Sequence, residues 1–129
     1  MSSIFTKIIN GEIPSHKVAE NDKFYAFLDI SPLQKGHTLV VPKKEVDYIF
    51  DVEDELLSEM IIFAKGIAGK IKKTFPCNRV GMTVIGLEVP HAHIHLIPIN
   101  AEKDMNFRSE KLNLSQDELA EIAQKLRNA

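Results

Sequence analysis

The sequence predicts an α+β fold, with a mostly antiparallel sheet, one long helix, and short helices near the N- and C-termini. Residues 51–75 carry apolar side chains at helical spacing, and serine caps stand before both terminal helices. Between them lie short apolar runs bounded by Gly, Pro and Asn, which are typical of strands. With 129 residues and 44% hydrophobic content, we expect residues 1–129 to form one domain around one core.

A short helix is expected at the start of the chain. Ser2 or Ser3 can cap it, because a serine hydroxyl accepts a hydrogen bond from a free amide of the first turn. Ile4, Phe5 and Ile8 form its apolar stripe. The Asn-Gly pair at positions 10 and 11 is a stop signal, so the helix should end there.

Three strands should follow. The first two, over residues 16–19 and 23–28, form a hairpin because a polar Asn-Asp pair separates them. A loop over residues 29–36 leads to a short buried strand over residues 38–41. Pro42 closes this strand, since proline has no amide to donate to a ladder.

The long helix has the clearest pattern. We expect Asp51 to cap it, with acidic residues in its first turn and lysines near its end, as the helix dipole favours. Pro76 bars its continuation. The apolar positions that repeat at helical spacing are Leu57, Met60, Ile61, Ala64, Ile67, Ala68 and Ile71.

Two more strands and a helix complete the fold. The strands are expected over residues 79–85 and 91–97, with a loop containing Gly86 and Pro90 between them. The last helix should cover about residues 115–127, because Ser115 and Glu118 have the spacing of a capping box.

Composition excludes several classes of protein. A net charge of -2 shows no basic excess, so nucleic acid is not an expected partner. No apolar run approaches the roughly 18 residues that a membrane span needs, and the N-terminus does not resemble a signal peptide. We therefore expect a cytoplasmic protein. The single cysteine excludes an internal disulfide and a cysteine zinc cluster.

The histidines indicate the chemistry. His91, His93 and His95 fall within five residues and, on a strand, would project from one face about 6.6 Å apart. An exposed strand face seldom uses histidine for polarity, so the cluster indicates a functional site. Three imidazoles can bind a metal. Alternatively, one neutral imidazole can attack phosphorus while its neighbours hold protons and phosphoryl oxygens. These residues alone leave both alternatives open.

Residues 91–97, which read His-Ala-His-Ile-His-Leu-Ile, resemble the histidine-triad (HIT) signature of three histidines alternating with hydrophobic residues. Residues 4–14, 26–32 and 36–44 look like segments of the Hint branch of that family, in the same order. The resemblance covers most of residues 4–97. It implies the HIT-like fold and a homodimer formed through the long helix and a sheet edge. It also implies a purine nucleotide ligand such as AMP.

The resemblance also implies an enzyme: a nucleotide hydrolase or transferase of the purine nucleoside phosphoramidase type. His93 would attack the α-phosphorus to form a nucleotidyl-histidine. The backbone carbonyl of His91 would orient the His93 ring for this attack. His95 would contact a phosphoryl oxygen, and His37 with His91 would assist proton movement. Asp29 would accept hydrogen bonds from the ribose hydroxyls. The base pocket would be lined by Ile4, Phe5, Ile8, Phe27, Ile30 and Leu39.

The chain departs from its relatives at two places. Many relatives bind zinc at positions that correspond here to Ser3, Thr6, Glu45 and His91. Hydroxyls are poor zinc ligands beside thiolates, so we expect neither a metal nor a cofactor. Glu88 stands where relatives often have a phosphate-binding Ser or Thr, and Thr83 corresponds to a frequent asparagine. We still count both as nucleotide-binding candidates.

Two alternative functions remain. Leu87 and Glu88 replace a usual polar pair, which is compatible with a non-catalytic nucleotide-binding or regulatory module. A metal-binding enzyme would use His91, His93 and His95 as its ligands.

Overall fold

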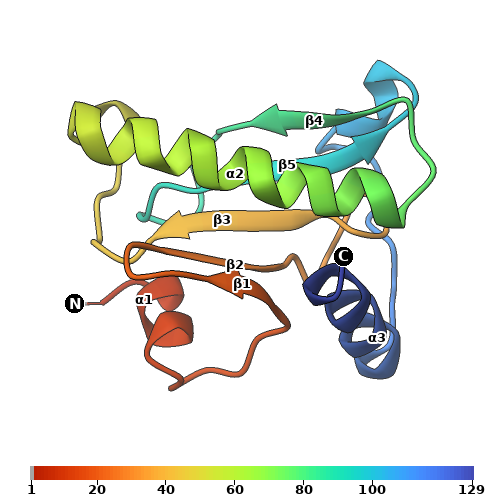
Figure 1. The fold of residues 1–129 in the computed structure, drawn as a ribbon, viewed down its shortest axis with the longest axis horizontal. Coiled ribbons are helices and arrows are strands. Elements are labelled where there is room, and N and C mark those ends of the chain that lie inside the picture. The colour runs from red at the N-terminus through yellow and green to blue at the C-terminus, as the bar shows by residue number, and fades with distance from the viewer. Residues whose placement is uncertain (1) are drawn as a thin grey trace.

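The computed structural model describes residues 2–129 and confirms the predicted α+β class (Figure 1). Within these residues there are three α-helices, two short 3-10 helices and one five-stranded sheet. The helices are α1 (Ile4–Ile9), η1 (Ile49–Asp51), α2 (Asp54–Thr74), η2 (Glu102–Met105) and α3 (Gln116–Arg127). The strands are β1 (Lys17–Glu20), β2 (Phe24–Leu28), β3 (Thr38–Pro42), β4 (Arg79–Thr83) and β5 (Ile94–Ile99).

The sheet has the order β1-β2-β3-β5-β4, and all neighbouring strands are antiparallel. The position of β5 between β3 and β4 decides which residues lie beside the histidine motif. In this register Leu39 of β3 and Thr83 of β4 both lie opposite His95. The segment that contains His37 is thereby brought beside the histidine triad, although 58 residues separate His37 from His95.

The two faces of the sheet are both covered. On β2, Phe24, Ala26 and Leu28 point into the larger core beneath α2 and α3, whereas Tyr25 and Phe27 pack with Phe5 and Ile8 of α1. This alternation follows from the period of two along a strand. Figure 1 shows α2 lying across one face of the sheet, with α1 near the β1–β2 hairpin. The histidine site lies on the α1 side.

Most element boundaries match the sequence prediction, and the serine caps are confirmed. Oγ of Ser3 accepts from the amide of Thr6, and Oγ of Ser115 accepts from the amide of Glu118. The Asp51 cap was wrong. Asp51 belongs to η1, and α2 begins three residues later, after Glu53, whose side chain makes no capping hydrogen bond.

The last two strands also differ from the prediction. β4 ends at Thr83 rather than at residue 85, and β5 begins at Ile94 rather than at residue 91. The amide of Ala92 donates to the carbonyl of Val46, in the loop after β3, instead of joining a ladder. His91 and His93 therefore precede the strand. Among residues 2–129, no helix has the length and hydrophobicity needed to cross a membrane.

Candidate active site

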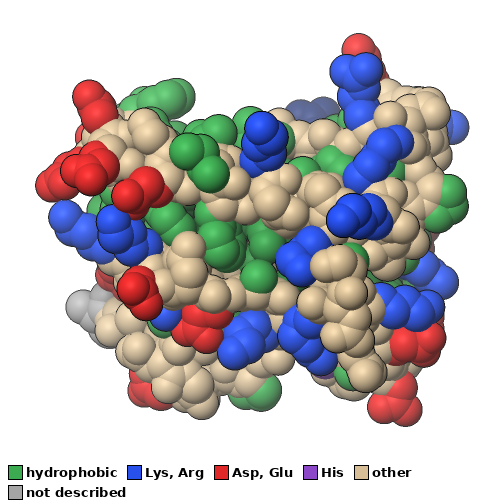
Figure 2. Space-filling model, viewed as in Figure 1, with side chains coloured by type: hydrophobic (Ala, Val, Ile, Leu, Met, Phe, Trp, Pro, Cys, Tyr) green, Lys and Arg blue, Asp and Glu red, His purple; other side chains and the backbone are tan. Residues whose placement is uncertain are grey.

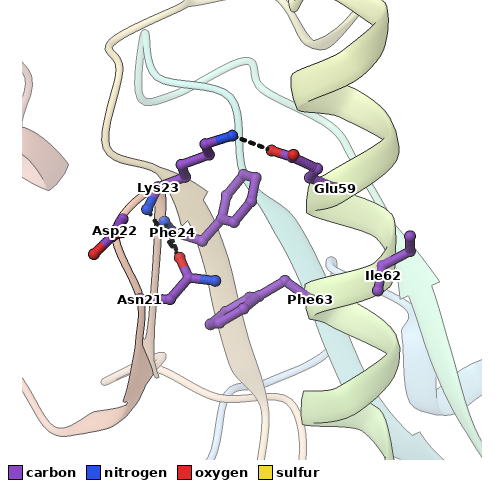
Figure 3. Close-up of a pocket in the computed structure, with 7 residues that line it drawn as sticks. All are labelled: Asn21, Asp22, Lys23, Phe24, Glu59, Ile62 and Phe63. Carbon is purple, nitrogen blue, oxygen red and sulfur yellow. Dashed lines mark hydrogen bonds and ion pairs between the residues drawn. The ribbon is translucent and has the colours of Figure 1, made fainter.

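The structure has a cavity of about 530 Å³ next to the histidines. It contains ten residues that the sequence nominated: Ile4, Phe5, Ile8, Phe27, Asp29, Ile30, Leu39, Glu88, His93 and His95. A second, more open hollow of about 560 Å³ lies between the β1–β2 turn and α2 (Figure 3). There an ion pair of 2.7 Å joins Lys23 to Glu59 above two phenylalanines, and no histidine lines it. The first cavity therefore holds the candidate site.

His93 has a defined tautomer. Its Nδ1 lies 2.8 Å from the backbone carbonyl oxygen of His91, which is the contact implied by the family resemblance. A carbonyl can only accept, so Nδ1 carries the proton and Nε2 keeps its lone pair. The ring of Phe5 packs edge-on against the imidazole at 5.0 Å. His93 thus brings a nitrogen with a free lone pair to the cavity wall.

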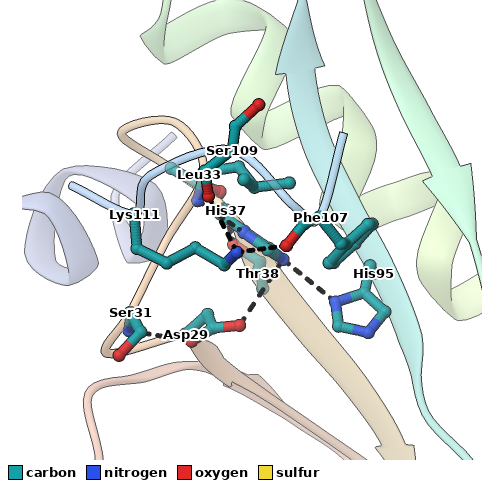
Figure 4. A network of polar contacts seen from close by, with 10 residues as sticks. Asp29, Ser31, Leu33, His37, Thr38, His95, Phe107, Ser109 and Lys111 are labelled. Carbon is teal, nitrogen blue, oxygen red and sulfur yellow. Dashed lines mark hydrogen bonds and ion pairs between the residues drawn. The ribbon is translucent and has the colours of Figure 1, made fainter. Parts of the chain in front are cut away.

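A second chain of hydrogen bonds defines His95 (Figure 4). The amide of Leu33 donates to Nδ1 of His37 at 3.1 Å, so Nε2 of His37 carries a proton. That Nε2 lies 3.0 Å from Nδ1 of His95 and donates to it. His95 must then carry its own proton on Nε2, which makes this nitrogen a donor.

Burial keeps both of these imidazoles neutral. Burial and the neighbouring His95 lower the pKa of His37 from 6.5 to about 3. Burial and the nearby His93 lower the pKa of His95 from 6.5 to about 4. His37 is 1% exposed and does not line the cavity. It therefore acts on the site through the cavity residues that it contacts, His95 and Asp29.

Asp29 closes the wall of the cavity beside these histidines (Figure 4). One carboxylate oxygen accepts from the amide of Ser31 at 2.8 Å, and the other lies 3.6 Å from Nε2 of His37. Because His37 is neutral, the second contact is not an ion pair. Burial raises the pKa of Asp29, while the Ser31 amide opposes that shift. The carboxylate is thus partly desolvated and has acceptor capacity to spare.

His91 is held away from the cavity. Its Nε2 lies 2.7 Å from the carbonyl oxygen of Pro42, and its Nδ1 lies 2.7 Å from the hydroxyl of Ser3. The ring is fully buried, and burial lowers its pKa. The three imidazoles lie on the α1 side of the sheet as predicted, because the His91 and His93 rings both pack against Phe5 and the His95 ring lies 4.9 Å from that of His93. Only His93 and His95 line the cavity. His91 has no free ring nitrogen with which to move a proton, but its backbone carbonyl contacts His93.

Neither possible metal site fits a metal. Donor atoms of Asp29, His37 and His95 lie within 4.8 Å of one another, but Nε2 of His37 is protonated and has no lone pair to offer. At the positions that the family resemblance relates to a zinc site, the lone pair on Nδ1 of His91 already accepts a hydrogen bond from the Ser3 hydroxyl. The other two residues there are Thr6 and Glu45, and the Thr6 hydroxyl donates to the Glu45 carboxylate at 2.6 Å.

Some site residues were outside the sequence prediction, and three predicted site residues, His37, His91 and Thr83, do not line the cavity. Phe107 and Lys111, from the segment after η2, line the cavity, and the Phe107 ring lies 4.9 Å from that of His95. The Lys111 ammonium donates to the carbonyls of Phe107 and Ser109 (Figure 4). No local pattern marks these residues. Thr83 pairs with His95 across the sheet but does not line the cavity.

The fold and the site define a small α+β domain with an imidazole whose Nε2 lone pair is free at the wall of a largely apolar cavity. Residues 10–102 match the family described as "HIT domain", so the chain belongs to the HIT family. This finding confirms the resemblance of the histidine motif and the predicted HIT-like fold.

Three relatives show how far the similarity extends. An uncharacterized HIT-like protein of Borreliella burgdorferi is 36% identical over 131 residues, covering 95% of this chain and 94% of that protein. Adenosine 5'-monophosphoramidase HNT1 of Saccharomyces cerevisiae is 42% identical over 101 residues, covering 78% of this chain and 64% of that protein. The crystal structure of a HIT-like protein of Bartonella henselae, described as involved in cell-cycle regulation, superposes with a TM-score of 0.85. That pair is 33% identical, with coverage of 98% of this chain and 95% of the other.

Proposed function

We propose that this protein is a nucleotide hydrolase or transferase that acts on nucleoside monophosphate derivatives, such as AMP phosphoramidates or dinucleotides. The tautomer of His93 carries the proposal, because its Nδ1–H is held by the His91 carbonyl and its Nε2 lone pair is left for the substrate. The similarity to a yeast adenosine 5'-monophosphoramidase supports the same class of substrate.

The reaction has two displacements at phosphorus. Nε2 of His93 attacks the α-phosphorus, a nitrogen–phosphorus bond forms, and the bond to the leaving group breaks as that group takes up a proton. Positive charge develops on the imidazole and strengthens the hydrogen bond from Nδ1–H to the His91 carbonyl. Water then attacks the same phosphorus, releases the nucleoside monophosphate and returns His93 to its starting form.

The remaining groups bind and polarise the substrate. His95 directs its Nε2–H at a phosphoryl oxygen, where negative charge grows in the transition state. His37 keeps that proton on Nε2 by donating to Nδ1. Asp29 accepts from the ribose hydroxyls. The base lies among the apolar side chains of Ile4, Phe5, Ile8, Phe27, Ile30 and Leu39.

The test is release of AMP from AMP-morpholidate and AMP-lysine. We expect the wild type to release AMP and His93→Gln to lose activity by about a thousandfold or more, since the nucleophile is gone. His16→Gln is the matched control, because the half-buried His16 contacts Gln116 through its ring and does not line the cavity. Undiminished release by His93→Gln would show that another group is the nucleophile.

A second candidate function is binding without catalysis. Glu88 lines the cavity, where its negative charge disfavours a phosphate, and the neighbouring Leu87 is 88% exposed and offers no polar group. This arrangement suits a nucleotide-binding or regulatory module. Calorimetric binding of AMP, without turnover of either phosphoramidate, would favour it over the enzyme.

We also propose a homodimer. β4 is an edge strand, and Met82 on it is 54% exposed. On α2, Ile61 and Ile62 are 43% and 69% exposed, and Figure 2 shows hydrophobic side chains gathered over this part of the surface. A second copy would cover this apolar surface and pair with the free edge.

A further inference from the structure

The first turn of α1 is tied to His91 by hydrogen bonds. Because the Pro42 carbonyl can only accept, Nε2 of His91 carries the proton and Nδ1 must accept. The closer donor to Nδ1 is the Ser3 hydroxyl, at 2.7 Å, whereas the Thr6 hydroxyl lies 3.5 Å away and donates to Glu45 at 2.6 Å. The Ser3 hydroxyl oxygen also accepts from the amide of Thr6 at 3.1 Å and so caps the helix.

Glu45 holds this turn from the other side. One of its carboxylate oxygens accepts from the amide of Ser3 at 2.7 Å and from the hydroxyl of Thr6 at 2.6 Å. These two hydrogen bonds lower the pKa of the Glu45 carboxyl, so it stays ionised. An exposed carboxylate in the loop after β3 thus fixes the turn that holds His91.

The orientation of the His93 ring depends on the position of His91. Residues 91–93 precede β5 and lack the support of a ladder. The amide of His91 donates to the carbonyl of Val89, and that of Ala92 donates to the carbonyl of Val46. Anchoring both nitrogens of the His91 ring fixes this segment instead. The carbonyl that orients His93 Nδ1 belongs to the same residue.

We propose that Ser3, held by Glu45, is a positioning residue that sets the orientation of the His93 imidazole through His91. This inference rests on the proposed function only for its kinetic readout. If Ser3 only capped α1, its replacement would affect the stability of that helix and not the orientation of His93. Ser115 is such a serine, because it caps α3 with the same amide contact and lies outside the site.

The kinetic experiment compares Ser3→Ala, Ser3→Thr and Glu45→Ala with the matched control Ser115→Ala, using AMP-morpholidate. We expect Ser3→Ala to lower kcat by about 10-fold to 100-fold, the range for a misplaced reacting group, with KM within about twofold. Glu45→Ala should lower kcat in the same direction without removing the cap. Ser3→Thr keeps a hydroxyl and should retain activity, as should Ser115→Ala. Equal effects of Ser3→Ala and Ser115→Ala would overturn the proposal.

The second readout is NMR of the histidine ring nitrogens, which needs no turnover. In the wild type, His91 should show a protonated Nε2 and a hydrogen-bonded, unprotonated Nδ1. Ser3→Ala should change the Nδ1 signal of His91 and broaden the Nδ1–H signal of His93, whereas Ser115→Ala should change neither. A His93 signal that does not respond to Ser3→Ala refutes the coupling. If the wild type turns over no substrate, the proposed function fails while this spectrum still decides the coupling.

Discussion

Nε2 of His37 lies 3.0 Å from Nδ1 of His95, and the backbone amide of Leu33 decides which of the two donates. Since that amide occupies the lone pair on Nδ1 of His37, the proton between the rings belongs to His37. One backbone amide thereby makes the cavity-facing nitrogen of His95 a hydrogen-bond donor.

Replacing His37 should break the series of hydrogen bonds that runs from the Leu33 amide through His37 to His95. In His37→Phe the ring volume is roughly kept but the donor to His95 is lost, so His95 can place its proton on either nitrogen. We expect kcat for AMP-morpholidate to fall by about 100-fold, within the usual range for proton-handling groups. His16→Phe, at a half-buried histidine that does not line the cavity, should have no effect on kcat. Wild-type kcat in His37→Phe would mean that the proton on His95 is set in another way.

The free energy of unfolding should depend on pH. The pKa of His37 is lowered from 6.5 to about 3 and that of His95 from 6.5 to about 4, so the unfolded chain binds more protons between pH 4 and pH 6.5. The free energy of unfolding therefore rises with pH across this window, by up to about 1.4 kcal/mol per pH unit for each histidine. The same contribution is lost as the pH falls through the window. Urea unfolding from pH 4.5 to pH 7.5 measures it. His37→Phe should give a shallower dependence, and an equal slope in both proteins would contradict the assignment.

Asp29 should bind the ribose hydroxyls through its carboxylate oxygens. We expect the wild type to bind AMP about tenfold or more tightly than 2'-deoxy-AMP, because a hydrogen bond to a charged group contributes about 1.5–3 kcal/mol. Asp29→Ala should bind both ligands weakly and nearly equally. Calorimetry of AMP and 2'-deoxy-AMP binding to the wild type and to Asp29→Ala gives the coupling free energy between the Asp29 carboxylate and the 2'-hydroxyl. Asp22→Ala, in the hairpin turn, is the control. A preference for AMP that survives in Asp29→Ala would assign ribose recognition to another residue.

Glu88 should weaken phosphate binding. It lies on the cavity rim, and its charge contributes to the raised pKa of Asp29, whereas Lys111 acts in the opposite direction. Glu88→Gln should therefore bind AMP several-fold more tightly, and Lys111→Gln more weakly. Both effects should shrink in high salt, because exposed charges are screened. Calorimetry at two ionic strengths, with Glu121→Gln on α3 as the control, measures this. Equal AMP affinity in wild type and Glu88→Gln would place Glu88 outside the phosphate site.

The apolar surface of α2 and β4 should hold the dimer together. Ile62→Asp places a charge where a second copy would pack, so we expect sedimentation velocity to show a monomer at concentrations where the wild type is a dimer. Gln124→Asp, on the exposed side of α3, should leave the dimer intact. A wild type that sediments as a monomer at every concentration would exclude this interface.

Local patterns predicted the fold well because they report local physics. Ser3 and Ser115 cap their helices as expected, and the apolar spacing of α2 holds, with Met60, Ala64 and Ile71 all buried. The Asp51 cap was a local error, whereas the start of β5 was mispredicted because of distant contacts. β5 begins late, because His91 is anchored to Ser3 and Pro42, which are 88 and 49 residues away along the chain.

The sequence by itself determined the helices, most of the strands, and the residue types of the site, including the histidine motif and Asp29. Tertiary structure alone decided which imidazole faces the cavity and which nitrogen of each ring carries a proton. It also added Phe107 and Lys111 to the wall. The physical reason is that a tautomer depends on the partner of each nitrogen. Here those partners are backbone groups and a hydroxyl that only the folded chain brings within hydrogen-bond distance.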